Sequence, residues 1–237
     1  MHLYRLSLYD KFNNNSLFFE DKLNNRKSIL VTGAHHSREP ASYTFNLYLI
    51  SLIITEYLNN NFYIVELLSQ IDIYFVPVVN IDGLEEISKQ YTLTNQLSYI
   101  RKNRNFNKDN NLCLFHNSGV DINRNYDIYY EHSKNSFYKN TCNEEYNGDY
   151  PFSEAESLSI KRMVEDIQRY SNNGLTIAFN YHAYGNMAII PPNFIEEDPL
   201  PYLKDNYYYN YLIYLDILKN GEFPKDFIYG NGFHTVE

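Results

Sequence analysis

Short apolar stretches rich in β-branched residues alternate along this chain with longer stretches of helical periodicity. Residues 29–31, 71–79 and 175–182 have the composition or the alternation of strands. Residues 39–58 carry apolar side chains at helical spacing, and a second helix is predicted to follow the capping-box pattern at 153–156. This order predicts an α/β sandwich around a largely parallel or mixed sheet, in one domain spanning residues 1–237.

Weaker patterns complete this outline. Residues 3–9 are predicted to form a strand and 17–19 its return, while 80–83 have the composition of a turn. Residues 202–219 look helical. The helix at 39–58 is apolar on several sides, so we expect it to be well buried.

Composition excludes several classes of protein. The chain has 20 basic and 29 acidic side chains, a formal charge of −9, and no basic patch of the kind that binds nucleic acid. No apolar stretch approaches the roughly 20 residues of a membrane span, and residues 1–5 lack the features of a signal peptide. From composition alone, Cys113 and Cys142 are either bridged or reduced.

A histidine and a glutamate three residues apart follow the first buried strand. His36 and Glu39 can reach one metal ion together if the segment between them turns as a helix does. Alone, the pair also fits an unrelated surface His and Glu. His35 competes with His36 as a ligand, but only His36 has the three-residue spacing.

A third candidate ligand, His182, ends the strand at 175–182. Active groups of open α/β sheets gather at the carboxyl ends of strands, so His182 is predicted to join His36 and Glu39. Two imidazoles and one carboxylate leave a position for water on zinc. The alternative for a lone histidine is a hydrogen-bonded core residue.

Two arginines and one asparagine could bind a substrate that carries a carboxylate. Arg101 can stabilise a developing oxyanion, and Asn123 with Arg124 can bind a carboxylate through an amide and a planar guanidinium. The alternative is that Arg101 and Arg124 are solvated or form salt bridges.

Together these segments resemble the zinc carboxypeptidases of the pancreatic carboxypeptidase A/B family. The resemblance covers roughly residues 25–195. The matching segments follow the family's order: 33–39, 77–83, 101–104, 120–126, 142–148, 151–156 and 181–184.

The resemblance implies a three-layer α/β/α sandwich around a mixed, mainly parallel twisted sheet, and one Zn²⁺ ion. It implies that zinc is bound by His36, Glu39 and His182, with Asp121 orienting His36. Arg101 would hold the oxyanion, and the substrate-binding residues would be Arg38, Asn123, Arg124 and Tyr184. The resemblance further favours a Cys113–Cys142 disulfide, a monomer, a secreted or lysosome-like location, and the C-termini of peptides or proteins as substrates.

One departure qualifies this expectation. The family's substrate-capping Tyr and general-base Glu lie beyond the segment that residues 230–237 resemble, so the last part of the domain is expected to be missing. Side-chain preference is set in the same missing part. Four late glutamates are expected to be solvated instead: Glu196, Glu197, Glu222 and Glu237.

Such a chain is expected to bind zinc but to hydrolyse poorly. Two alternatives remain open: a non-catalytic module that binds zinc and peptide, and a related zinc hydrolase of acylated amino acids.

Overall fold

The computed structural model describes residues 2–7, 26–106, 113–128, 130, 139–171, 173–190, 216, 220 and 228–231. The chain divides into two compact units, Met1–Ala183 and Tyr184–Glu237, which are treated separately below. The single domain expected from the sequence stays a prediction.

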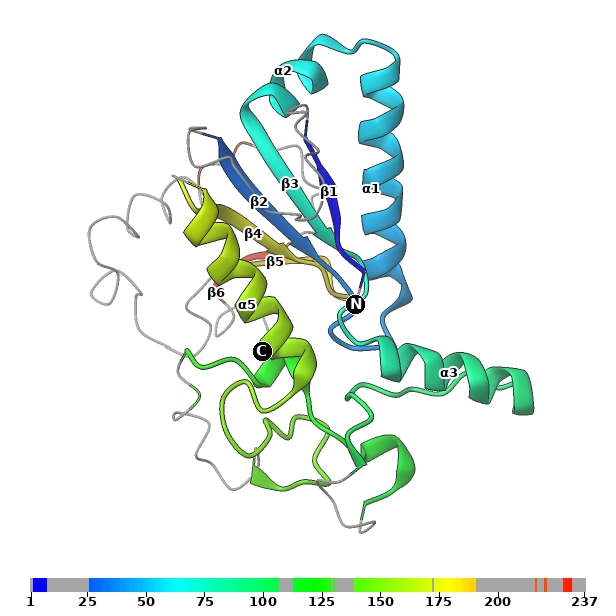
Figure 1. Ribbon diagram of the computed structural model, residues 1–237. Coiled ribbons are helices and arrows are strands. Elements are labelled where there is room, and N and C mark those ends of the chain that lie inside the picture. The colour runs from blue at the N-terminus through cyan, green and yellow to red at the C-terminus, as the bar shows by residue number, and fades with distance from the viewer. Residues whose placement is uncertain are drawn as a thin grey trace, which may run out of the picture. The chain divides into compact units, whose positions relative to one another are not determined.

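The first unit is built on a four-stranded sheet (Figure 1). Its strands are β1 (Tyr4–Leu6), β2 (Lys27–Thr32), β3 (Ile71–Val76) and β4 (Leu175–Asn180), in the order β1-β3-β2-β4. β2 pairs in parallel with both β3 and β4, while β1 is antiparallel to β3. The mixed, mainly parallel sheet predicted from the sequence is confirmed.

β3 is an inner strand buried on both faces, which explains why its sequence is apolar except for Asp72, whose carboxylate pairs with Arg5 and Arg26. Successive side chains of a strand point to opposite faces. Tyr74 and Val76 therefore enter one core cluster, while Ile71, Ile73 and Phe75 enter the other.

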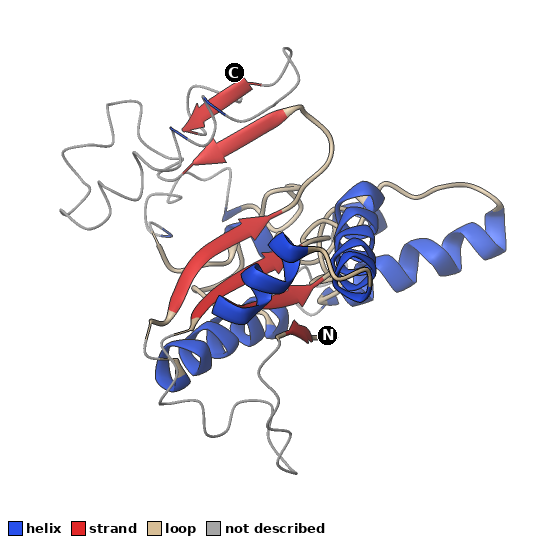
Figure 2. Ribbon diagram, turned by 90° about the horizontal axis from the view of Figure 1, so that it is seen from above, coloured by secondary structure: helices blue, strands red, loops and turns tan. Residues whose placement is uncertain are grey.

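Helices cover both faces of the sheet, as Figure 2 shows from above. α1 (Pro40–Leu58) and α2 (Phe62–Gln70) pack on one face, and α5 (Ala155–Tyr170) packs on the other. Their core residues are Ile53 and Leu68 on the first face, and Ile160, Met163 and Ile167 on the second. This is the three-layer α/β/α arrangement that the resemblance implied.

Two helices differ from expectation. α1 occupies the predicted range, with Pro40 in its first turn, but Leu47, Tyr48 and Leu58 on it are exposed, so it is not buried all round. The capping box at 153–156 was wrong in detail: Glu154 is the N-cap of α5 and makes no capping side-chain hydrogen bond.

The predicted turn at residues 80–83 is instead the start of α3 (Ile81–Thr94), which projects away from the sheet (Figure 1). Asn80 caps this helix, because its Oδ1 accepts a hydrogen bond of 2.9 Å from the backbone N–H of Gly83. Its Nδ2 donates to the carbonyls of His35 and Arg101, at 3.3 Å each. Asn80 therefore joins the loop after β2 to the segment that carries Arg101.

The segment around residues 100–150 has short 3₁₀ helices at Phe115–Asn117 and Ile122–Arg124, and a disulfide joins Cys113 to Cys142. Lys102 is fully buried there, and its ammonium donates to the carbonyls of Asn117, Thr141 and Asn143. These contacts order a segment that has little regular secondary structure.

In the second unit, β5 (Met187–Ile190) pairs in parallel with β6 (Ile228–Asn231). The predicted strand at 17–19 lies outside the described residues, as does nearly all of the predicted helix at 202–219. A search of the described helices found none that combines the length and the apolar character needed to cross a membrane.

Candidate metal centre

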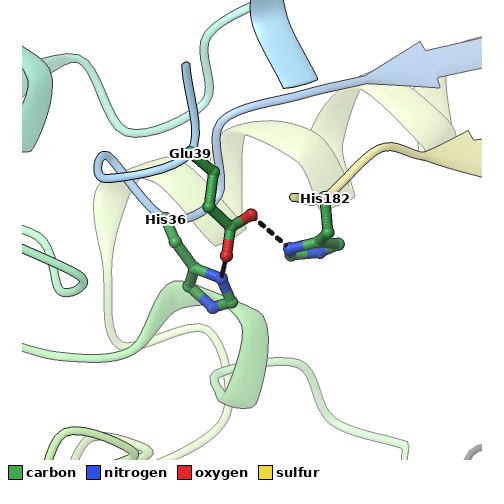
Figure 3. A group of neighbouring side chains, drawn as sticks. All are labelled: His36, Glu39 and His182. Carbon is green, nitrogen blue, oxygen red and sulfur yellow. Dashed lines mark hydrogen bonds and ion pairs between the residues drawn. The ribbon is translucent and has the colours of Figure 1, made fainter. Parts of the chain in front are cut away.

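The loop after β2 brings His36 and Glu39 together. The backbone N–H of Glu39 donates to the carbonyl of His36 at 3.2 Å, which forms a tight turn just before α1. Both side chains are buried, and His36 Nδ1 lies 2.7 Å from Glu39 Oε1 (Figure 3). The three-residue spacing thus places both groups on one side of the turn.

His182 reaches the same place from the neighbouring strand. Thr32 and Asn180 are paired across β2 and β4, so the segments that follow these two parallel strands emerge at one edge of the sheet. His182 Nδ1 lies 2.8 Å from Glu39 Oε2 (Figure 3). Its side chain keeps 31% of its surface exposed, so the group is open to solvent on this side.

The three side chains form a group that can hold a metal ion. One ligand atom from each of His36, Glu39 and His182 lies within 4.8 Å of the others. Each Nδ1 lies at hydrogen-bond distance from a carboxylate oxygen of Glu39, so the three groups are directed at one place. Two imidazole nitrogens and one carboxylate match the donors of a catalytic zinc ion with an open position.

Asp121 holds His36 from the far side of its ring. His36 Nε2 lies 3.1 Å from Asp121 Oδ1, which leaves Nδ1 directed toward Glu39. Asp121 is fully buried, and its Oδ2 accepts from Arg101 Nε at 2.9 Å and Arg101 Nη2 at 2.8 Å. A carboxylate behind a ligating histidine fixes the tautomer and the orientation of the ring.

The neighbouring side chains keep the carboxylates of Glu39 and Asp121 charged. Burial opposes the ionisation of Glu39, but hydrogen bonds with His182 and His36 outweigh it and lower the pKa of this carboxyl to about 2. Burial likewise opposes the charge of Asp121, yet hydrogen bonding to His36 and the nearby arginines lower its pKa. Burial lowers the pKa of His36, but hydrogen bonds to Asp121 and Glu39 dominate and raise it.

His35, the competing histidine, lies outside the metal-binding group. Its Nε2 is 2.9 Å from the Tyr126 hydroxyl, and its Nδ1 is buried without a hydrogen-bond partner. Burial, followed by the neighbouring His182 and His36, lowers the pKa of His35 to about 3, so its ring is neutral. The preference for His36 agrees with this geometry.

Arg124 and Asn123, the predicted partners of the substrate carboxylate, are both engaged with other side chains of the protein. Arg124 Nη2 lies 3.0 Å from Glu145 Oε1, and Arg101 Nη2 lies 3.9 Å from the same oxygen. Asn123 Oδ1 accepts from Asn180 Nδ2 at 3.2 Å.

Two predicted substrate-binding residues remain. Arg38 forms an exposed pair with Glu144 at 3.2 Å. Tyr184 belongs to the second unit and is fully exposed, so its role stays a prediction. Sequence reasoning missed Glu145 and Asn180, although Glu145 lies within the segment 142–148 that carried the resemblance.

Comparisons with known proteins agree with this geometry. The sequence profile of the family described as zinc carboxypeptidase matches residues 5–219. Mast cell carboxypeptidase A of Rattus norvegicus is 29% identical over 166 residues, covering 70% of this chain and 36% of the relative. The inactive metallocarboxypeptidase ECM14 of Paracoccidioides lutzii is 31% identical over 168 residues, covering 70% of this chain and 26% of the relative.

Solved structures give the same picture of the fold. Carboxypeptidase A from Helicoverpa armigera superimposes with a TM-score of 0.65 and 25% identity, over 91% of this chain and 47% of that one. Thrombin activatable fibrinolysis inhibitor gives a TM-score of 0.68 at 20% identity, over 99% of this chain and 51% of that one, and supports the fold alone. This chain therefore spans about half or less of these relatives. With the profile match over most of its length, the chain belongs to the zinc carboxypeptidase family.

Proposed function

We propose that the protein is a zinc-dependent metallocarboxypeptidase that hydrolyses the C-terminal peptide bond of peptides or proteins. One observation carries the proposal: the ligand atoms of His36, Glu39 and His182 converge to within 4.8 Å at the carboxyl ends of two adjacent parallel strands. A zinc ion bound there would supply an acidified water and polarise the scissile carbonyl.

The surrounding side chains would position the substrate. Arg124 and Asn123 would bind the terminal carboxylate, which restricts cleavage to a chain end. Arg101, held by Asp121, would donate to the oxyanion that develops on the scissile carbonyl. Arg38 would line outer subsites, and Tyr184 would contribute to a neighbouring one.

A proton acceptor is needed to activate the water. The described carboxylates beside the metal-binding group, Asp121 and Glu145, are already paired with arginines. The four late glutamates considered in the sequence, Glu196, Glu197, Glu222 and Glu237, lie outside the described residues.

A non-catalytic zinc and peptide-binding protein is the second candidate. The similarity to relatives named inactive metallocarboxypeptidases favours it.

The two candidates differ in turnover. The full chain, loaded with one equivalent of zinc, is incubated with peptides that end in a free carboxylate or in an amide, and release of the last residue is followed by mass spectrometry. Release from the free acid alone supports the peptidase. Tight binding of the free acid without release supports the second candidate. A protein that binds neither zinc nor peptide refutes both.

His182→Ala provides the matched negative variant, because it removes the most exposed ligand and leaves the buried turn at 36–39 intact. Acylated amino acids, tested in parallel, would reveal the related hydrolase activity.

We further propose that the protein is a monomer that acts in an oxidising compartment, such as the extracellular space or a lysosome-like organelle. The Cys113–Cys142 disulfide supports the compartment, because such bonds persist where thiols are not kept reduced.

A further inference from the structure

We propose that Glu145 is an internal competitor of the substrate: its carboxylate takes the place of the peptide's terminal carboxylate on Arg124 and lowers the affinity of the site. This inference rests on the proposed function, since it assigns a specificity-determining role beside the same arginines.

The geometry of the ion pair supports a competitor. Glu145 Oε1 lies 3.0 Å from Arg124 Nη2 and 3.9 Å from Arg101 Nη2, so one oxygen faces both guanidinium groups. A peptide carboxylate bound by Arg124 would need the same donors. With Glu145 in place, each of the two guanidinium groups faces a carboxylate of the protein, Asp121 for Arg101 and Glu145 for Arg124.

The backbone of Glu145 is fixed close to the arginines. Its N–H donates to Asn143 Oδ1 at 2.8 Å, and the buried ammonium of Lys102 donates to the carbonyl of Asn143 at 2.9 Å. The disulfide anchors Cys142, three residues before Glu145. A fixed backbone keeps the carboxylate at a high local concentration beside Arg124.

The side chain itself is free to leave. The Glu145 side chain is 30% exposed and that of Arg124 is 33% exposed, so water can solvate both groups when they separate. Ion pairs that water reaches in this way contribute modest net stability, and a substrate carboxylate can displace them. Asp121 cannot act in the same way, because it is fully buried against His36 and Arg101.

The neighbouring Glu144 offers a matched control. It has the same chemistry and lies one residue away, but it pairs with Arg38, and its side chain is 46% exposed. Glu145→Gln and Glu144→Gln each remove one negative charge, so they share any general electrostatic effect. Only the first removes the proposed competitor.

The test measures the Kd of a small carboxylate without a scissile peptide bond, 4-phenylbutanoate, and of its amide, by calorimetry on the zinc-loaded full chain. Such a ligand is not hydrolysed and does not extend to the outer subsites beside Arg38, the partner of Glu144. Glu145→Gln should tighten binding of the free acid by about 3- to 5-fold, the upper part of the range expected for removal of one ion pair near the surface. The amide should be unaffected by either variant, and Glu144→Gln should leave the free-acid Kd within about twofold. Unchanged thermal unfolding would show that both variants are folded.

Two outcomes overturn the inference. Unaltered or weaker binding of the free acid to Glu145→Gln, in a protein that prefers the acid over the amide, overturns the inference and leaves the proposed function standing. No preference for the acid in either protein overturns both. A preference that appears only in Glu145→Gln supports the inference strongly.

Discussion

At the scale of single residues, Asp121 links the metal-binding group to the substrate-binding arginines. Its Oδ1 contacts His36 Nε2 and accepts from the backbone N–H of Asn123 at 2.9 Å, while its Oδ2 accepts from Arg101. One buried carboxylate therefore orients a predicted zinc ligand and a predicted oxyanion donor together. A change at this position affects both.

Asp121→Asn is predicted to weaken zinc binding by about 10- to 100-fold, as found when partners of metal ligands are lost. The amide retains the size of the side chain but loses the negative charge and one acceptor, so His36 is no longer held in its tautomer. Competition with a chromophoric chelator measures the zinc affinity. Glu165→Gln, an exposed change of the same type on α5, should leave it unaltered. Equal affinities for Asp121→Asn and the parent would contradict this role.

Glu156 is predicted to make stability depend on pH. Burial, together with Glu154 and Asp82, raises the pKa of its carboxyl above the ordinary value of 4.5. A folded-state pKa above the unfolded one means that the folded protein loses stability as the pH rises from about 4.5 through the raised pKa.

At pH 7 the midpoint urea concentration of unfolding should therefore be higher for Glu156→Gln than for the parent. This difference should vanish near pH 4. Urea titrations at several pH values test this, with Glu165→Gln as the exposed control. A variant that is less stable at pH 7 would show that the hydrogen bond from Asn103 outweighs the charge.

A short spacing and a strand end carried enough information to predict that three side chains converge, while their role as zinc ligands stays a prediction. His36, Glu39 and His182 meet because two parallel strands end at the same edge of the sheet. The contact of Glu145 with Arg124 was not predicted, because it depends on the path of irregular segments and on side-chain direction. No periodicity encodes such a contact.

At the scale of secondary structure, the elements with a clear periodic pattern were predicted, and those without one were missed. β3, β4 and α5 were predicted, because their apolar patterns follow the periods of strands and helices. α2 was missed because it is short and apolar, and α3 because its first residues, including Asn80 and Gly83, have the composition of a turn. Asn80 in fact makes contacts typical of a cap, which composition does not separate from a turn.

The disulfide is the main covalent constraint on the irregular segment. Cys113 and Cys142 are 29 residues apart, and the loop between them contains Asp121, Asn123 and Arg124. Replacing both cysteines by serine is predicted to lower the free energy of unfolding by about 3 to 4 kcal/mol, from the loss of loop-closure entropy. Urea unfolding with and without reductant measures the change.

Reductant should not change the free energy of unfolding of the serine variant. The free energy of unfolding of the parent should decrease to the value of the serine variant when the disulfide is reduced. Equal free energies for oxidised parent and serine variant would mean that Lys102 and its three backbone acceptors order the segment without the bond.

At the scale of the whole molecule, a bound metal would join distant parts of the chain. Glu39 and His182 are 143 positions apart. Zinc at a hundredfold excess over its Kd is predicted to stabilise the folded state by about 2.7 kcal/mol, because it binds the assembled site and not the unfolded chain. For a chain of this size that corresponds to a rise in Tm of about 5 to 10 °C.

Differential scanning calorimetry with zinc and then with a chelator tests this prediction. His182→Ala should show no rise, and the chelator should return the parent to its starting Tm. A rise of the same size in His182→Ala would place the metal elsewhere.

The distance along the chain between the two halves of this group has a consequence for synthesis. A ribosome synthesises His36 and Glu39 long before it reaches His182. One imidazole and one carboxylate alone bind zinc weakly. The nascent protein would therefore bind the proposed ion only after β4 has paired with β2, so metal uptake would report the pairing of these two strands.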